Sequence, residues 1–294
     1  MKLDKIQYID RKTNKILVET VPGEKILKFL YHNPFGKLPL ESLVKRKCLS
    51  SFYGKLMDKK KSTNQIESFI KNNFIDMNDF QKKIGDFTSF NDFFYRKLKP
   101  NARKIEDGLV SPADGKAIGF KKIDDWNKFF VKGSEFSLEK YLNDKKLLEK
   151  YKGGSMVIVR LAPADYHRYH FPANGKVGDR NKIDGYYYSV SPYAIKDNFR
   201  VFCENKRELT LLKTSEYGDI LISEIGATMV GGIKQTYTPN TNVKKGEEKG
   251  FFTFGGSSVL LLFEKNKVKI DRDILKNTKN GYETMVYMGE KIGE

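Results

Sequence analysis

The sequence predicts an α+β fold in which a helical N-terminal region packs on a mostly antiparallel β-sheet core. Before about residue 100, apolar residues recur at the three- and four-residue spacing of a helix face. After residue 105 the pattern changes to short apolar runs, rich in β-branched and aromatic residues and bounded by Gly, Asn and Pro, as strands are. The 294 residues are 39% hydrophobic and 31% charged, which excludes collagen-like, disordered and membrane-embedded chains.

Five helices are expected in chain order. Ser62 and Gln65 resemble a capping box at the start of the third, and Ser89 and Asp92 are expected to cap the fourth. The fifth interrupts the β region. The ranges are 25–31, 39–58, 64–72, 90–98 and 138–150.

The clearest strands are expected at 155–161, 220–225, 231–237, 251–254 and 259–264. On this basis we divide the chain into a helical, basic region, residues 1–100, and a β-rich domain, residues 101–294. Neither a transmembrane helix nor a signal peptide is expected, so any membrane contact would be peripheral.

The net charge is +17, and residues 1–100 hold 21 Lys and Arg against 11 Asp and Glu. An anionic partner is therefore expected, either nucleic acid or a phospholipid surface. Lysine-rich stretches at 45–47 and 59–61 lie beside the apolar stripes of the expected helices. These helices are either a structural cover with solvated lysines or an amphipathic surface that rests on anionic lipid.

Histidine use points to a site. His167 and His170 stand three residues apart in Asp165-Tyr166-His167-Arg168-Tyr169-His170-Phe171-Pro172, a segment that is either structural or catalytic. We expect no metal, because no Cys or His is placed to complete a ligand set. The two cysteines, Cys48 and Cys203, lack the spacing of a zinc site or a disulfide framework, which favours a reducing compartment.

Two further segments contain Asp and Ser. Ser111-Pro112-Ala113-Asp114-Gly115 is first of all a turn signal, and Gly255-Gly256-Ser257-Ser258 is typical of a hairpin or bulge between strands. Together with the histidines, they supply the residue types that activate a hydroxyl nucleophile. One interpretation is a Ser-His-Asp hydrolase without self-cleavage, although the Gly-x-Ser-x-Gly elbow is absent.

Several segments, in order, resemble the motifs of phosphatidylserine decarboxylase, a family of pyruvoyl-dependent lyases. The resemblance runs from about residue 90, through Phe93-Phe94-Tyr95-Arg96-Lys97-Leu98, to the C-terminus. The family often has Gly-Gly-Ser-Thr or Leu-Gly-Ser-Thr at 255–258, and Ser258 keeps the hydroxyl here. The other segments are Ser-Pro-Ala-Asp114-Gly, Asp165-Tyr-His167-Arg-Tyr-His170-Phe-Pro, Glu204-Asn-Lys-Arg207, Gly226-Ala-Thr-Met-Val-Gly231, Lys245-Gly-Glu-Glu248 and Gly255-Gly-Ser257-Ser258.

The resemblance implies a proenzyme that cuts itself between Gly256 and Ser257 into a 256-residue β chain and a 38-residue α chain. Ser257 would attack the Gly256 carbonyl, the ester would eliminate, and Ser257 would become a pyruvoyl group. The family relation implies His170 as the base that takes the serine proton, with Asp114 orienting it. Both glycines are expected to provide backbone without a Cβ.

In turnover, the resemblance implies a Schiff base between the pyruvoyl group and phosphatidylserine, with CO2 and phosphatidylethanolamine as products. His167 is the expected proton donor, while Asp165 and Tyr166 are weaker candidates for shaping the site. Neither a metal nor pyridoxal phosphate is required.

The family relation further implies peripheral binding to an anionic membrane at the cytoplasmic face of the cell membrane, association of the α and β chains, and a homodimer. A basic nucleic-acid-binding protein is a second alternative, suggested by the charge together with 16 Tyr and 21 Phe. No groove-reading motif accompanies them, so we expect no nucleic-acid partner.

Overall fold

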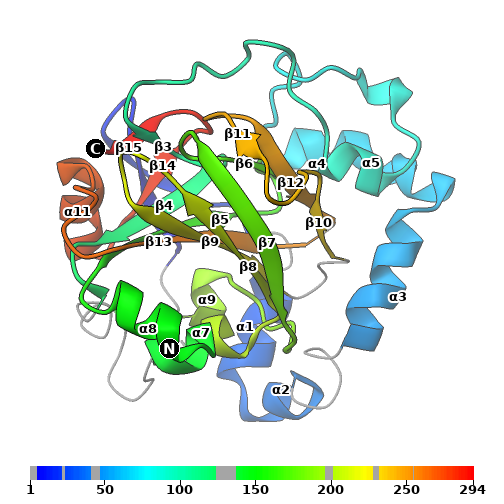
Figure 1. Cartoon of the computed structure of the whole chain (residues 1–294). Helices are drawn as coiled ribbons and strands as arrows, with labels where there is room; N and C mark the ends of the chain where they lie inside the picture. The colour runs from blue at the N-terminus through cyan, green and yellow to red at the C-terminus, as the bar shows by residue number, and fades with distance from the viewer. Residues whose placement is uncertain are drawn as a thin grey trace.

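A ten-stranded sheet runs through the centre of the molecule (Figure 1). The computed structural model describes residues 5–21, 24–40, 47–123, 137–195, 201–227, 232–253 and 255–294. Neighbouring strands are antiparallel except for β1 and β14, so the predicted mostly antiparallel α+β fold is confirmed. In spatial order the strands are β11 (Asn242–Val243), β7 (Gly175–Ile183), β8 (Arg207–Lys213), β9 (Asp219–Gly226), β13 (Ser257–Phe263), β5 (Ser155–Leu161), β4 (Gly115–Phe120), β14 (Glu283–Val286), β1 (Gln7–Asp10) and β2 (Lys15–Val18).

Two smaller sheets complete the β structure of the described residues. One has the order β10 (Ile233–Gln235), β12 (Glu248–Phe252), β6 (Arg168–His170), and the other pairs β15 (Lys291–Gly293) with β3 (Leu109–Val110). Strand β6 carries His170, so the three-stranded sheet positions part of the predicted site.

The helices lie around the main sheet and are mostly short. Their bounds are α1 Glu24–His32, α2 Pro34–Pro39, α3 Lys47–Met57, α4 Ile66–Asn73, α5 Phe90–Phe94, α7 Leu138–Leu142, α8 Lys145–Tyr151, α9 Pro192–Ile195, α10 Val201–Glu204 and α11 Arg272–Lys279, with 3₁₀ turns η2 Lys60–Gln65 and η3 Ile84–Asp86.

The N-terminal helices bury apolar residues in two places. Leu30, Tyr31 and Leu40 join the main core under the large sheet. A second core under α3, α4 and α5 contains Met57, Ile66, Phe87, Phe90, Phe93 and Phe94. The apolar stripes predicted from the sequence are therefore packed in part, as the structural interpretation expected. Phe52, in the stripe expected at 39–58, is instead 63% exposed, and residues 43 and 44 of that stripe lie outside the described residues.

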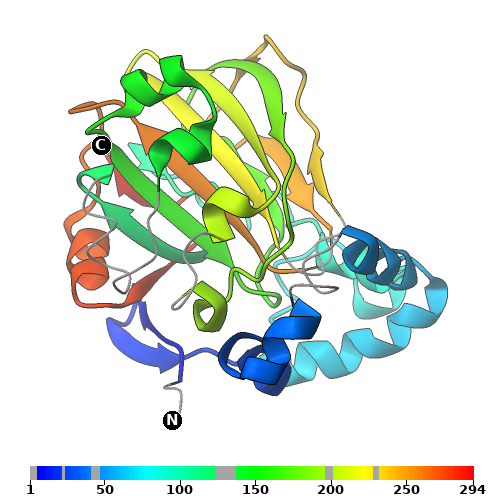
Figure 2. The ribbon, with the colours of Figure 1, turned by 90° about the horizontal axis from the view of Figure 1, so that it is seen from below.

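The region 1–100 is not wholly helical. Strands β1 and β2 form a hairpin at the edge of the large sheet, and Figure 2 shows it in dark blue beside the N-terminus. The hairpin joins the sheet through parallel pairing of β1 with β14, which lies more than 270 residues later in the chain. Such long-range pairing leaves no local signal in the sequence.

Several helix predictions were wrong in detail. The helix expected at 90–98 ends at Phe94, because Tyr95 leaves the helical conformation. The helix expected at 138–150 is two helices, because Asn143 adopts a left-handed conformation with φ 50° and Asp144 caps a new helix by accepting from the Lys146 and Leu147 N–H groups. Ser62 and Gln65 form no capping box, since the Ser62 hydroxyl accepts from the Phe90 N–H instead. The Ser89 cap is confirmed, with its side chain accepting from the Asp92 N–H.

Candidate active site

Ser257 begins the central strand β13 and is completely buried. It pairs with Gly226 of β9 on one side and with Leu161 of β5 on the other. Ser258 pairs with Arg160 and Ile225, and because side chains alternate along a strand, the two serine hydroxyls lie on opposite faces of the sheet. The pairing of β13 with both neighbouring strands therefore fixes the position of the 256–257 peptide bond relative to the core.

His167 is the histidine that contacts Ser257. Its Nδ1 lies 3.4 Å from Ser257 Oγ, and its Nε2 lies 3.0 Å from the Ala162 carbonyl oxygen. Because a carbonyl only accepts, Nε2 carries the hydrogen and Nδ1 is left to accept from the serine hydroxyl. Phe94 stacks on the imidazole with 3.8 Å between ring centroids.

Burial, together with the nearby charges of Arg96 and Lys116, lowers the pKa of His167 to about 3. The imidazole is therefore neutral throughout the physiological pH range. A neutral, oriented ring suits hydrogen bonding to Ser257, but so low a pKa makes His167 a weak base.

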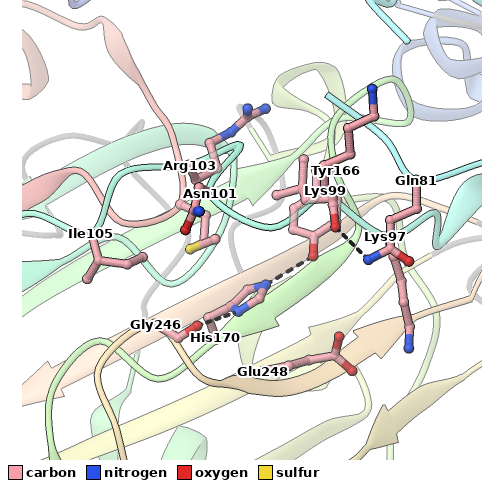
Figure 3. A pocket seen from close by; sticks show the side chains of 12 residues that line it. Gln81, Lys97, Lys99, Asn101, Arg103, Ile105, Tyr166, His170, Gly246 and Glu248 are labelled. Atoms are coloured by element: carbon pink, nitrogen blue, oxygen red, sulfur yellow. Dashed lines mark hydrogen bonds between the residues drawn. The ribbon is translucent and has the colours of Figure 1, made fainter. Parts of the chain in front are cut away.

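His170 lies nearby with different partners (Figure 3). Its Nδ1 donates to the Gly246 carbonyl oxygen at 2.9 Å, and its Nε2 accepts from the Tyr166 hydroxyl at 3.1 Å. Burial lowers its pKa, while the Gly246 hydrogen bond and the carboxylates of Glu248 and Asp114 act in the opposite direction. The ring lines a cavity of about 290 Å³, so His170 is reachable from outside while His167 is not.

Asp114 sits in the turn before β4 and is held by two donors. Arg103 Nη2 lies 2.8 Å from Asp114 Oδ2, and the Met288 N–H donates to Oδ1 at 2.8 Å. The predicted chain of hydrogen bonds from Ser257 through His170 to Asp114 is therefore not assembled in the described residues. The structure joins Ser257 to His167 instead. Gly246 and Tyr166 already bond the two ring nitrogens of His170, and Arg103 already bonds the Asp114 carboxylate.

Asp165 and Tyr166 do shape the site. The Asp165 carboxylate accepts from Lys116 Nζ at 2.9 Å and from the Ala162 N–H at 2.7 Å, which closes the turn that carries the Ala162 carbonyl to His167. Sequence reasoning missed Lys116 and Arg103. The sequence feature that could have identified them is a basic residue within, or shortly before, the buried segment that contains Asp114.

The two glycines before Ser257 differ. Gly255 has φ +132°, a conformation that L side chains rarely adopt, so a side chain here would be strained. A Cβ at Gly256 would meet Val190 Cγ2 at an ordinary 3.6 Å, so the expectation that both positions exclude a Cβ holds for Gly255 alone. Gly256 is partly exposed while Ser257 is closed off.

Other predicted motifs support the site. Asn205 donates to the carbonyl oxygen of Gly226, the residue paired with Ser257, and Glu248 binds Arg168 beside the histidines. Thr228, Met229, Val230 and Gly231 lie outside the described residues. Among the described residues, no group of three or more His, Cys, Asp or Glu side chains is arranged to hold a metal ion.

The sequence profile described as "Phosphatidylserine decarboxylase" matches residues 90–294. The chain belongs to the phosphatidylserine decarboxylase family. The start of the match coincides with the start of the motif resemblance. The prediction of a carboxy-lyase is confirmed, and the comparisons give no support to a simple hydrolase or a nucleic-acid-binding protein.

Relatives named "Phosphatidylserine decarboxylase proenzyme" align over nearly the whole chain. The protein from Fusobacterium nucleatum is 60% identical, covering 100% of this chain and 99% of its own. Those from Clostridium tetani and Desulfitobacterium hafniense (strain DSM 10664 / DCB-2) are 51% and 47% identical, each with 98% of both chains aligned. The similarity thus includes the N-terminal region before the profile match.

Proposed function

We propose that the chain cuts itself between Gly256 and Ser257, converts Ser257 to a pyruvoyl group and decarboxylates phosphatidylserine to phosphatidylethanolamine. One observation carries the proposal: a completely buried serine at the start of a central strand presents its hydroxyl to the unprotonated nitrogen of His167. Its relatives' shared designation as proenzymes supports a precursor that is processed.

The residues around position 257 fit a pyruvoyl group. The group would lie in a closed site beside the neutral His167 ring, while the partly exposed Gly256 lets the new chain end move into water. When present, the group supplies a ketone that condenses with the substrate's primary amine and accepts the electrons of the broken carbon–carbon bond.

The cleavage step breaks one backbone bond and forms another. Ser257 Oγ attacks the Gly256 carbonyl carbon, its proton passes to a base, and the amide nitrogen leaves protonated, which gives an ester. Loss of the α-proton of residue 257 then expels the Gly256 carboxylate. Addition of water and release of ammonia leave the ketone at the new N-terminus.

The two histidines divide this work in our proposal. His167 holds the serine hydroxyl, but with a pKa of about 3 it has little tendency to keep a proton. His170 is assisted by the carboxylates of Asp114 and Glu248 and is the better base for cleavage, once it leaves Tyr166 and Gly246. His167 remains beside residue 257 in the mature enzyme. Because a ring with so low a pKa gives up a proton readily but does not store one, we propose that His167 relays to the substrate carbon a proton that it takes up during turnover.

Two alanine variants test this division. His170→Ala is expected to remain uncut, because no adequate base takes the Ser257 proton, and Asp114→Ala to mature more slowly. His167→Ala is expected to be cut but to decarboxylate at least about a hundredfold more slowly, as loss of a positioned proton-transfer group does. Denaturing gels measure the cleavage, and CO2 release from phosphatidylserine measures the turnover.

A different result would reverse the roles of the two histidines. If His167→Ala stays uncut while His170→Ala matures normally, the histidine in contact with Ser257 is itself the cleavage base. Tyr166→Phe is a matched control, because it removes the His170 partner hydroxyl but keeps both imidazoles.

We also propose that the N-terminal helices dock the protein on an anionic bilayer, peripherally and at the cytoplasmic face of the cell membrane. Large apolar side chains there are exposed, with Phe74 at 90%, Phe35 at 83% and Ile26 at 65%. Exposed lysines at 59–61 lie between α3 and α4. Residues 45 and 46 are outside the described residues. None of the described helices is long and apolar enough to span a membrane.

Vesicle binding tests this surface. Lys60→Glu/Lys61→Glu is expected to weaken binding to phosphatidylserine vesicles by about tenfold or more, since each basic residue near the surface contributes about 1 kcal/mol. Binding should also weaken as salt shortens the Debye length below about 8 Å. Lys265→Glu/Lys267→Glu has the same charge change in the loop after β13 and should bind as the parent does. Equal loss in both variants, or equal binding to neutral vesicles, would contradict docking through the N-terminal helices.

A further inference from the structure

A second cavity, of about 280 Å³, adjoins the one in Figure 3, and the two share Arg103 and Tyr166. Its wall combines the segment after α4, the segment after α5 and the turn that precedes His167. Phe74 and Ile75 lie on the first of these segments, and Arg96 lies on the second. The cavity therefore lies between the exposed Phe74 and the turn that bonds His167, although neither Ser257 nor His167 lines it.

Arg96 is a buried cation in this wall, with 3% of its surface exposed. Its Nη2 donates to the Ala164 and Asp165 carbonyl oxygens at 2.9 and 3.3 Å, and its guanidinium lies 4.4 Å from the Phe80 ring centroid. Its Nε has no hydrogen-bond partner within the described residues. Burial lowers the pKa of Arg96 to about 10, so it remains charged at neutral pH.

The carboxylates in the wall do not pair with Arg96. Arg103 binds Asp79 and Asp114, Lys116 binds Asp165, and Asp76 is exposed. The described hydrogen-bond partners of Arg96 are backbone carbonyls. The charges of Asp114 and Asp165 act on Arg96 only from beyond ion-pair distance. Because the guanidinium lines the cavity and its bonded partners are neutral, a phosphate in the cavity would supply the contacting anion that it lacks.

We propose that Arg96 binds the phosphodiester of the lipid headgroup, an inference that rests on the proposed function. The headgroup also carries a carboxylate, but an arginine on that group would stabilise the reactant more than the transition state in which its charge is lost. Arg96 bonds one side of the 162–165 turn, and His167 bonds the Ala162 carbonyl in the same turn. The phosphate would therefore be anchored one turn away from residue 257.

The position of Phe74 is consistent with a lipid phosphate bound at Arg96. Phe74 is 90% exposed and has φ 54°, a left-handed conformation that is costly for a bulky residue. At the cavity's lip, its ring would contact the lipid next to the bound phosphate. The cavity and the exposed apolar surface then serve one ligand with a charged head and an apolar tail.

The test uses mature enzyme, a short-chain phosphatidylserine as substrate and a short-chain phosphatidylglycerol as inhibitor. The inhibitor has the phosphodiester but neither the amine nor the carboxylate. Arg96→Met is expected to raise both the KM for the substrate and the inhibition constant by about tenfold or more, with kcat changed by less than about threefold. Arg96→Lys, which keeps the charge, should fall between Arg96→Met and the parent. Lys265→Met removes an exposed cation that lines neither cavity and should leave both constants unchanged.

The results that overturn the inference are distinct from failure of the proposed function. A lower kcat with unchanged KM and inhibition constant would make Arg96 a positioning residue for the turn. Loss of self-cleavage and of thermal stability in both Arg96 variants would make it structural. If the parent protein lacks decarboxylase activity, the proposed function fails. Binding of the phosphatidylglycerol probe to uncut Ser257→Ala chain, with and without Arg96→Met, then still decides whether Arg96 holds a phosphodiester.

Discussion

Replacing Ser257 by alanine is expected to leave a single uncut 33.9 kDa chain without decarboxylase activity. The hydroxyl is the only atom of residue 257 that can attack the Gly256 carbonyl, and the ketone derives from the same side chain. Both reactions therefore depend on one oxygen atom. Denaturing gels and CO2 release from phosphatidylserine measure the two losses together.

Ser258→Ala is the matched control for this experiment. The Ser258 hydroxyl is also buried, but it lies on the opposite face of β13 from His167. Removing it should slow maturation at most. Complete loss of cleavage in Ser258→Ala, or cleavage at 256–257 in Ser257→Ala, would show that the wrong serine has been assigned.

A buried ion pair connects the two sheets that carry the site. Lys249 of β12 lies 2.9 Å from Glu224 of β9, and both side chains have no exposed surface. Gln235 bonds both partners, accepting from Lys249 at 2.9 Å and donating to Glu224 at 2.8 Å. Strand β12 pairs with β6, and β9 pairs with β13, so this pair holds the His170 strand against the Ser257 strand.

Lys249→Met is expected to lower the free energy of unfolding by about 3–5 kcal/mol, because it leaves Glu224 charged and buried without its cation. Lys249→Met/Glu224→Gln should recover most of the loss, since no uncompensated charge remains. Denaturant unfolding measures the difference in a Ser257→Ala background, which keeps the protein a single chain.

The control for this prediction is Lys265→Met, which replaces an exposed lysine and should change the free energy of unfolding by less than about 0.5 kcal/mol. A loss below about 1 kcal/mol for Lys249→Met would show that the pair contributes little. Failure of the double variant to recover would assign the effect to packing of the lysine stem rather than to charge.

Much of the β structure followed from local pattern. Strand β5 has the predicted bounds, β9 is one residue longer at each end than predicted, and β13 begins two residues earlier and ends one residue earlier. Strand β10 is shorter than the predicted 231–237, and β12 begins three residues before the predicted 251–254 and ends at Phe252. Strands β5, β9 and β13 are continuous apolar segments because both faces are buried. The break at Asn143 also had a local signal, since Asn followed by Asp favours a left-handed residue and a new cap.

The arrangement of the site depended on contacts that local pattern does not encode. The motifs supplied Asp114, His167, His170 and Ser257, but which histidine faces the serine is decided elsewhere. The Gly246 carbonyl occupies one nitrogen of His170, and Arg103 takes the Asp114 carboxylate. The division at residue 100 and the proposed homodimer remain predictions, as does the membrane location.

The mass of the purified protein tests the central claim most directly. Self-cleavage with pyruvoyl formation predicts two species, one ending at Gly256 and one of 38 residues beginning at position 257. The 38-residue species should have no free N-terminal amine. It should gain the mass of an added primary amine after treatment with that amine and a borohydride, because the ketone forms a Schiff base that the hydride reduces. Active protein that gives only the uncut 294-residue mass, or a fragment that begins with an intact serine, would contradict the account.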